Sequence, residues 1–380
     1  MKFIKVKDLF KIKKGKKVIE VDEIGPIRYI QIDDLRNNNN IKYCNNENKY
    51  VYSEVDDIII AWDGANAGTI GYGLKGAIGS TLAVLSKKNK NFDTEFCGLF
   101  LKSKFNYLRD KCTGATIPHI SRTSLEELEV PNMPIITQKR IVKILDKSQE
   151  LINKRKEQIE ALDELVKSKF IDMFGNVNIN SKGWNITSMD ELIDVIGGYA
   201  FKSTEFIDKG VPVLKIGNIN AGYFKPTNLM FWKKDDKLEK YLIKPDDLVI
   251  SLTGTVGKDD YGNVCIMGDD YEEYYLNQRN AKLEIKSNEL LNKYYLTYLL
   301  KVPEIKQRII GISRGVRQAN IANKDILNLE VPNPPIELQK QFAYFVKQVD
   351  KLKFEMEKSL KELEDNFNSL MQRAFNGELF

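Results

Sequence analysis

The sequence is poor in the residues that disulfide-rich and zinc-binding proteins depend on. Its 380 residues include four cysteines and a single histidine. The cysteines, Cys44, Cys97, Cys112 and Cys265, lie far apart and form no CxxC pair, so they indicate neither a disulfide framework nor a zinc site. Such cysteine usage is typical of a reducing compartment, and we expect the protein to work in the cytoplasm.

Long apolar runs and a strong charge are also lacking. No apolar stretch reaches the ~20 residues that a bilayer span requires, and the opening MKFIKVKDLF has no apolar core of the kind that signal peptides carry. We therefore expect no membrane partner. The 58 Lys and Arg residues exceed the 53 Asp and Glu residues enough to give a net charge of +5. That charge is compatible with a polyanionic partner but does not identify one.

The chain does contain an internal repeat. LEVPNMPIITQK at 128–139 returns as LEVPNPPIELQK at 329–340, an offset of 329 − 128 = 201 residues. The same offset holds without a gap from Gly114 and Gly315 to Phe174 and Phe375. Weaker similarity precedes it, because DDIIIAWDG at 56–64 matches DDLVISLTG at 246–254. The sequence therefore predicts two homologous halves whose loops have diverged.

Each half changes its periodicity after the repeated segment. The earlier part holds short β-branched apolar runs closed by glycine, which are typical of buried strands. The later part has apolar residues every seven positions, as a coiled-coil helix does. The prolines indicate where these helices start, and Gly175 and Gly377 where they end. We predict an α+β protein with two β-rich mixed globular domains, residues 1–135 and 179–334, separated by two long antiparallel coiled-coil helices, residues 136–178 and 335–380, in a pseudo-twofold internal repeat.

This arrangement resembles the DNA specificity subunit of type I restriction–modification systems. The resemblance covers the whole chain, and its strongest mark is the duplicated pattern from Gly114 to Gln138 and from Gly315 to Gln339. It implies that each globular part is a target recognition domain for one half of a bipartite, asymmetric DNA site. It also implies that the helices set the spacing and dock two methyltransferase subunits, with restriction–translocase subunits joining for cleavage. The family usually has an acidic residue before the glutamine, but Thr137 and Leu338 stand there, which leaves the glutamine a helix-start or a partner-contact role.

Three segments imitate catalytic motifs. NPPI at 333–336 lacks the aromatic ring with which adenine methyltransferases stack a flipped base. GYGLKG at 71–76 matches the glycine spacing of dinucleotide-binding motifs, but no strand–helix–strand unit with a ribose-binding acid follows it. PDD at 245–247 with EIK at 284–286 imitates nuclease acids, but the first half has no counterpart to the second strand's acid. His119 aligns with Asn320, which cannot act as a general base.

We therefore expect a non-catalytic chain that binds no cofactor, with S-adenosylmethionine held by the partner methyltransferase. The alternatives are a self-contained DNA methylase or nuclease, and an adaptor whose two domains bind peptides.

Loops between the duplicated strands are the predicted places where double-stranded DNA is read. Side chains that can hydrogen-bond base edges or phosphates gather there. In the first half these are Arg36, Asn37, Thr116, His119 and Arg122; in the second half they are Lys215, Asn218, Asn220, Tyr223, Arg279, Arg314, Arg317, Gln318 and Asn320.

Overall fold

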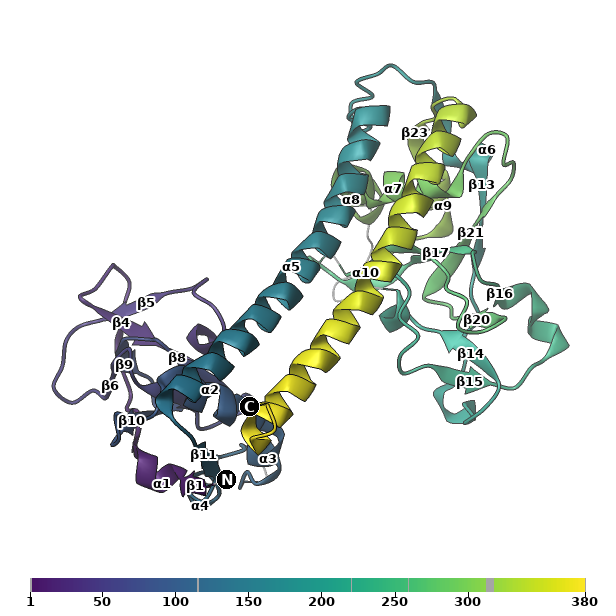
Figure 1. Cartoon of the computed structure of the whole chain (residues 1–380). Coiled ribbons are helices and arrows are strands. Elements are labelled where there is room, and N and C mark those ends of the chain that lie inside the picture. Colours follow the sequence, from purple (N-terminus) through teal and green to yellow (C-terminus); the bar gives the residue numbers. More distant parts are fainter. Residues whose placement is uncertain (1, 115, 220, 259, 312–317, 380) are drawn as a thin grey trace. The chain divides into compact units, whose positions relative to one another are not determined.

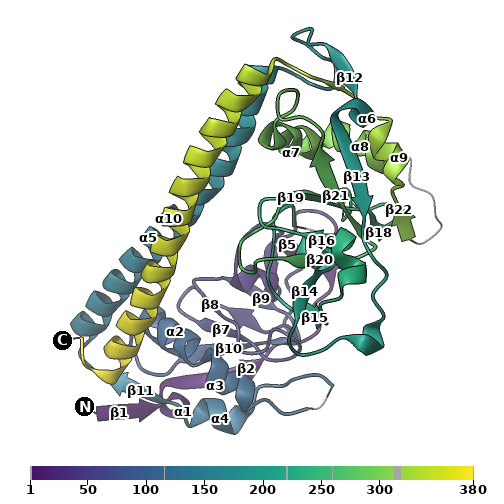
Figure 2. The same ribbon diagram turned by 90° about the vertical axis from the view of Figure 1, so that its right-hand side faces the viewer.

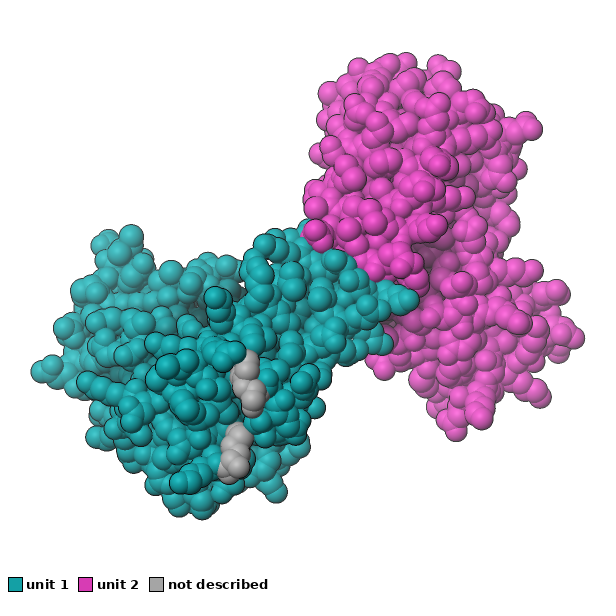
Figure 3. All heavy atoms as spheres, in the orientation of Figure 1, with its two compact units in different colours: residues 1–157, 357–380 teal, residues 158–356 magenta. Residues whose placement is uncertain are grey.

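The computed structural model describes residues 2–114, 116–219, 221–258, 260–311 and 318–379. The chain divides into two compact units: unit 1 comprises residues 1–157 and 357–380, and unit 2 comprises residues 158–356 (Figure 3). Two long helices, α5 (Ile135–Phe174) and α10 (Ile336–Asn376), each contribute one part to unit 1 and the other part to unit 2 (Figure 1).

Unit 1 is built on a four-stranded sheet in the order β2-β10-β7-β8. Its strand β7, the IIIA of the DDIIIAW segment, is buried throughout and pairs antiparallel with β10. A second sheet has the order β3-β5-β4-β9-β6, and β1 pairs with β11 of the repeated segment. The elements are β1 (Lys2–Lys5), α1 (Val6–Leu9), β2 (Phe10–Lys14), β3 (Glu20–Val21), β4 (Ile27–Ile30), the 3-10 turn η1 (Asp33–Leu35), β5 (Lys42–Cys44), β6 (Tyr52–Ser53), β7 (Ile58–Ala61), β8 (Ile70–Tyr72), β9 (Gly76–Ile78), β10 (Leu82–Lys87), α2 (Thr94–Ser103), α3 (Phe105–Asp110), α4 (Arg122–Glu126) and β11 (Glu129–Asn132).

Unit 2 repeats this plan with its own second sheet. The four-stranded sheet has the order β13-β21-β17-β19, the other sheet has the order β15-β14-β20-β16, and β12 pairs with β23. Figure 2 shows α9 beside β13, where Asn323 donates a hydrogen bond to the Val195 carbonyl. The elements are β12 (Ile186–Ser188), α6 (Met189–Leu192), β13 (Ile193–Gly197), η2 (Ser203–Glu205), β14 (Val211–Leu214), η3 (Ile216–Asn218), β15 (Met230–Trp232), η4 (Asp236–Tyr241), β16 (Leu242–Ile243), β17 (Leu248–Ser251), β18 (Thr253–Thr255), β19 (Val264–Ile266), β20 (Tyr274–Leu276), β21 (Asn280–Ile285), α7 (Lys293–Lys301), α8 (Pro303–Ile310), β22 (Gln318–Asn320), α9 (Asn323–Leu327) and β23 (Glu330–Pro332).

The long helices begin directly after the prolines and end directly before the glycines that the sequence indicated, so α5 and α10 are shorter than the predicted segments 136–178 and 335–380. Pro134 and Pro335 immediately precede α5 and α10. Gly175 and Gly377 follow at φ of 74° and 76°, a left-handed conformation in which glycine has no steric cost. No helix among the described residues has an apolar run long enough to cross a bilayer.

Each unit buries part of both long helices in its core. In unit 1 the start of α5, with Ile141 and Leu145, joins the same hydrophobic cluster as Phe375 near the end of α10. In unit 2 the end of α5, with Phe174, joins the cluster that contains Phe342 at the start of α10. The start of one helix thus packs with the end of the other in both units, so the predicted antiparallel pairing and the α+β class are confirmed.

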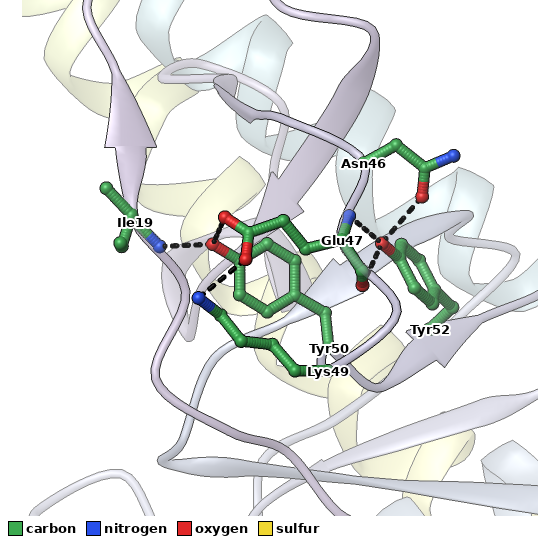
Figure 4. A network of polar contacts seen from close by, with 6 residues as sticks. All are labelled: Ile19, Asn46, Glu47, Lys49, Tyr50 and Tyr52. Atoms are coloured by element: carbon green, nitrogen blue, oxygen red, sulfur yellow. Dashed lines mark hydrogen bonds and ion pairs between the residues drawn. The ribbon is translucent and has the colours of Figure 1, made fainter.

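The second sheet of unit 1 is fastened by two tyrosine hydroxyls (Figure 4). The Tyr50 hydroxyl accepts a hydrogen bond from the Ile19 amide and donates to the Glu47 carboxylate. The Tyr52 hydroxyl accepts from the Glu47 amide and lies 2.9 Å from Asn46 Oδ1. These contacts fix the turn between β5 and β6.

Candidate nucleic-acid interface

In unit 1 the loop after β7, residues 62–68, collects the predicted segments. Arg36 Nη2 donates to Asn66 Oδ1 over 2.6 Å, which ties the segment after η1 to this loop. The Gly64 amide donates to the Pro118 carbonyl over 2.9 Å, which ties the segment around His119 to it. Two of the predicted DNA-reading segments therefore meet at the carboxyl end of one buried strand.

His119 is held by a carboxylate in this loop. Its backbone forms an antiparallel bridge with Asp63, and its Nδ1 lies 2.6 Å from Asp63 Oδ1. Lys14 Nζ lies 2.7 Å from the other oxygen, Oδ2. Burial raises the pKa of the Asp63 carboxyl, but the hydrogen bonds from Lys14 and His119 outweigh that effect and hold the pKa below its ordinary value. The His119 side chain remains 45% exposed, whereas that of Asp63 is 16% exposed.

The other predicted residues of unit 1 lie on the surface. Arg122 is the first residue of α4, and its Nε donates to Glu126 over 2.7 Å. Thr116 is exposed, and Asn37 is exposed with its side-chain oxygen accepting the Asn39 amide. Contacts of these three residues with DNA stay predictions.

In unit 2 the corresponding place is a short two-stranded sheet. Thr253 pairs with Asn320, and Thr255 pairs with Gln318, between β18 and β22. Arg279 is exposed, and its carbonyl accepts the Leu252 amide just before β18. The backbones of Arg279, Gln318 and Asn320 are thereby brought to the end of the buried strand β17. Arg314, Arg317 and Asn220 lie outside the described residues.

The loop after β14 holds the remaining predicted residues, and one of them must be reassigned. Asn218 is 4% exposed; its side-chain oxygen accepts the Lys215 amide, and its nitrogen donates to the Lys225 and Thr227 carbonyls. Its amide thus holds the loop, and we withdraw it as a base contact. Lys215 lies with Nζ 4.5 Å from the centre of the Phe206 ring, while Tyr223 is 57% exposed.

The glutamine of each repeated segment is buried and hydrogen-bonded to backbone groups. Gln138 is fully buried: its Oε1 accepts the amide of Asp93, the residue that caps α2, and its Nε2 donates to the Met133 carbonyl. Gln339 does the same in unit 2, accepting the amide of Asn292, the cap of α7, and donating to Pro334. Both fasten a helix start to a globular unit, which resolves the role that the sequence left open.

The catalytic look-alikes have structural roles. Asp247 accepts the Lys244 amide and forms an ion pair with Lys282, and Asp57 makes the equivalent turn contact with the Glu54 amide. GYGLKG spans the turn between β8 and β9 without a following helix. Among the described residues, no group of three or more His, Cys, Asp or Glu side chains could hold a metal ion.

Sequence reasoning missed Lys14, Asp63 and Asn66, which organise the loops without being predicted to touch DNA. A signal for Asp63 was present, because it ends DDIIIAWD at the position where Thr253 ends DDLVISLT. A difference at the end of an otherwise repeated strand marks a place where the two halves have diverged.

The family description "Type I restriction modification DNA specificity domain" matches residues 1–161 and 181–365. The chain is 30% identical to the type I restriction enzyme MjaVIII specificity subunit of Methanocaldococcus jannaschii, with 99% of this chain and 92% of the relative covered. It is 19% identical to the type I restriction enzyme EcoBI specificity subunit of Escherichia coli, with 92% and 79% covered.

Two solved structures resemble the fold over nearly the whole chain. The type I restriction–modification S subunit from M. genitalium superposes with a TM-score of 0.53 at 19% identity, covering 98% of this chain and 96% of that one. A chain from a structure of type I R-M complex assembly and conformational transition superposes with a TM-score of 0.64 at 16% identity, covering 100% and 98%.

Proposed function

Because the chain belongs to the type I restriction modification DNA specificity domain family, we propose that it reads DNA sequence for a type I restriction–modification complex. Each unit reads one half of a bipartite, asymmetric site. The observation that carries this proposal is the repeated strand end: both units gather hydrogen-bonding loops at the end of the same buried strand, β7 or β17, and display different side chains there. Equal scaffolds with different polar surfaces suit two different half-sites.

We propose that the chain supplies the address and its partners supply the chemistry. The acids that imitate a nuclease centre are engaged in turns and ion pairs. The only histidine has its Nδ1 on a carboxylate, and Asn320 replaces it in unit 2. Methyl transfer from S-adenosylmethionine, with the adenine turned out of the duplex, belongs to a methyltransferase pair, and cleavage to the restriction–translocase subunits.

The outer faces of the long helices are the proposed docking sites for the methyltransferase subunits. In unit 2, α10 exposes Tyr344 and Phe354 by 68% and 66%, and α5 exposes Ile171 by 61%. In unit 1, α5 exposes Ile136 by 71% and helps to line an open groove of about 1130 Å³ together with α2 and α10. Large apolar side chains left in water on an otherwise charged helix are typical of a protein–protein contact.

The proposed function is tested by methylation mapping. The chain should be expressed with its methyltransferase subunits in cells that lack other methylation, and the genome sequenced for modified bases. We expect one split motif, and none when the chain or the methyltransferase is expressed alone. Replacing residues 1–130 with the first half of another family member should change one half of the motif only. Methylation by the chain alone, or a change in both halves, would refute the proposal.

The docking proposal has a separate test. Tyr344→Lys and Phe354→Lys should each reduce copurification of the methyltransferase at least tenfold, because a lysine cannot be desolvated in an apolar contact. Lys351→Gln, an exposed change on the same helix, is the matched control and should copurify normally. Normal assembly of both lysine variants would place the methyltransferase elsewhere.

A further inference from the structure

The two units share one backbone bridge at the end of the buried strand. In unit 1, Asp63 faces His119 across an antiparallel bridge. In unit 2, Thr253 faces Asn320 in the same way, and the two pairs occupy equivalent places in the repeated sequence. The bridge is a feature of the shared scaffold, whereas the side chains on it are not shared.

The neighbouring hydrogen bond confirms that the two bridges are equivalent. The Ile120 amide donates to the Trp62 carbonyl over 2.9 Å. The Ile321 amide donates to the Leu252 carbonyl over 2.8 Å. His119 and Asn320, the bridge residues, directly precede Ile120 and Ile321. The side chains at 119 and 320 therefore leave the backbone at equivalent positions of the two units.

A third position differs together with this pair. Lys14 ends β2 opposite Ala83 of β10, and Gly197 ends β13 opposite Ala281 of β21. Lys14 forms an ion pair with Asp63, and Gly197 has no side chain with which to do so. Where unit 1 carries lysine, aspartate and histidine, unit 2 therefore carries glycine, threonine and asparagine on the same scaffold.

The contact with Asp63 determines which ring nitrogen of His119 carries the proton. An ionised carboxylate has no proton to give, so the 2.6 Å contact requires that Nδ1 carries the proton and donates it to Asp63 Oδ1. In the neutral ring Nε2 is then an acceptor. Among the described residues none hydrogen-bonds Nε2, and nearly half of the side chain is exposed.

We propose that His119 and Asn320 are equivalent base-reading residues of the two units, and that Asp63 is a positioning residue that acts through His119. This inference rests on the proposed function and assigns its specificity to two positions. His119 Nε2 accepts a hydrogen bond from an exocyclic amine in the major groove, adenine N6 or cytosine N4. Asn320 can both donate and accept, as the adenine edge requires. Lys14 keeps Asp63 ionised and directed at the ring.

The test uses the full chain assembled with its methyltransferase subunits, and methylation mapping as the readout. His119→Asn should change or relax the preference at one base pair of one half-site, by roughly five- to tenfold in discrimination, and leave the other half-site unchanged. Asn320→His should do the same in the other half-site only. The unaffected half-site reports in each case that the complex is folded and active.

Asp63→Asn tests positioning. An amide can accept or donate to Nδ1, so it releases the ring from one tautomer, and we expect relaxed discrimination at the same base pair that His119→Asn affects. The double variant should be no worse than His119→Asn alone, because Asp63 has no other route to the base. Glu54→Gln, which removes an exposed carboxylate from an ion pair with Lys75, is the matched control and should leave the motif intact.

The outcomes separate this inference from the function on which it rests. If the unmodified complex methylates no split motif, the proposed function fails. If it does, but His119→Asn leaves both halves of the motif intact, the inference fails alone. An Asp63→Asn effect at another base pair, or one that adds to that of His119→Asn, would remove Asp63 as a positioning residue.

Discussion

Unit 1 and unit 2 fold the same four-stranded sheet, β2-β10-β7-β8 in one and β13-β21-β17-β19 in the other. Both fasten it to the long helices with a buried glutamine, Gln138 or Gln339. Their second sheets differ in strand number and order, and the side chains at the strand ends differ in charge. The parts that hold a unit to the helices have been kept, and the parts that face outward have changed, as the proposed reading of two different half-sites requires.

The largest effects are expected where the cores close on the helices. Phe174 is fully buried and packs against Phe170, Tyr295 and Phe342 of unit 2. Its equivalent in unit 1, Phe375, packs against Phe96 and Phe100. Truncation of a buried phenylalanine leaves a cavity and costs about 3–5 kcal/mol.

We therefore predict that Phe174→Ala destabilises unit 2 and that Phe375→Ala destabilises unit 1, the former by more because three rings lose a partner. Hydrogen exchange of β17 and β21, compared with β7 and β10, would locate each loss. Equal loss of protection in both units for either variant would show that the units unfold as one, and would break the comparison.

Most of the fold could be predicted from the internal repeat of the sequence. The helix bounds followed from Pro134, Pro335, Gly175 and Gly377, and the buried strand β7 followed from DDIIIAW, because these signals are local. Asn218 could not be judged from the sequence: it looks like a polar loop residue, and only the fold shows its amide bonded to backbone groups up to nine residues away. His119 and Asp63 are 56 residues apart, so their contact was likewise beyond local reasoning.

The buried glutamines come next in size. Replacing Gln339 with alanine leaves the Asn292 amide and the Pro334 carbonyl unpaired inside unit 2, at a cost of about 2–4 kcal/mol. Gln138→Ala should cost unit 1 a similar amount. Chemical denaturation measures both, with the exposed Lys340→Ala as the control. A loss below about 0.5 kcal/mol for either variant would mean that water replaces the side chain.

The stability contributed by the two equivalent bridge positions, Asp63 and Thr253, should depend differently on acid. The pKa of Asp63 is held below its ordinary value, so its stabilising contribution is present above the unfolded pKa of about 3.9 and is lost as pH falls through the lower folded value. We predict that Asp63→Asn destabilises unit 1 by about 1 kcal/mol at neutral pH and that this difference shrinks below about pH 4. Thr253 stands at the equivalent position of unit 2 and does not titrate, so its replacement should give no such pH-dependent difference. Melting curves of the unmodified chain and of Asp63→Asn between neutral and acidic pH would test this prediction. A stability difference between the two that does not depend on pH would assign the effect to packing.

The smallest expected effect concerns the ion pairs between the two long helices. Asp163 of α5 pairs with Lys353 of α10 in unit 2, at 2.7 Å, and Glu364 of α10 pairs with Lys156 of α5 in unit 1, at 2.8 Å. The two acids are equivalent positions of the repeat, so each unit contains one ion pair from its own acid to the other helix.

All four groups of these ion pairs reach solvent, and such pairs contribute only about 0.2–1 kcal/mol. The Lys353 side chain is 28% exposed and that of Lys156 is 50% exposed, so Lys353→Gln should cost more than Lys156→Gln. Both losses should fade in about 1 M salt, where charges are screened within ~3 Å. Urea denaturation at low and high salt measures them, and a loss that persists in salt would show that the lysine stem packs against the neighbouring helix and that its charge contributes little.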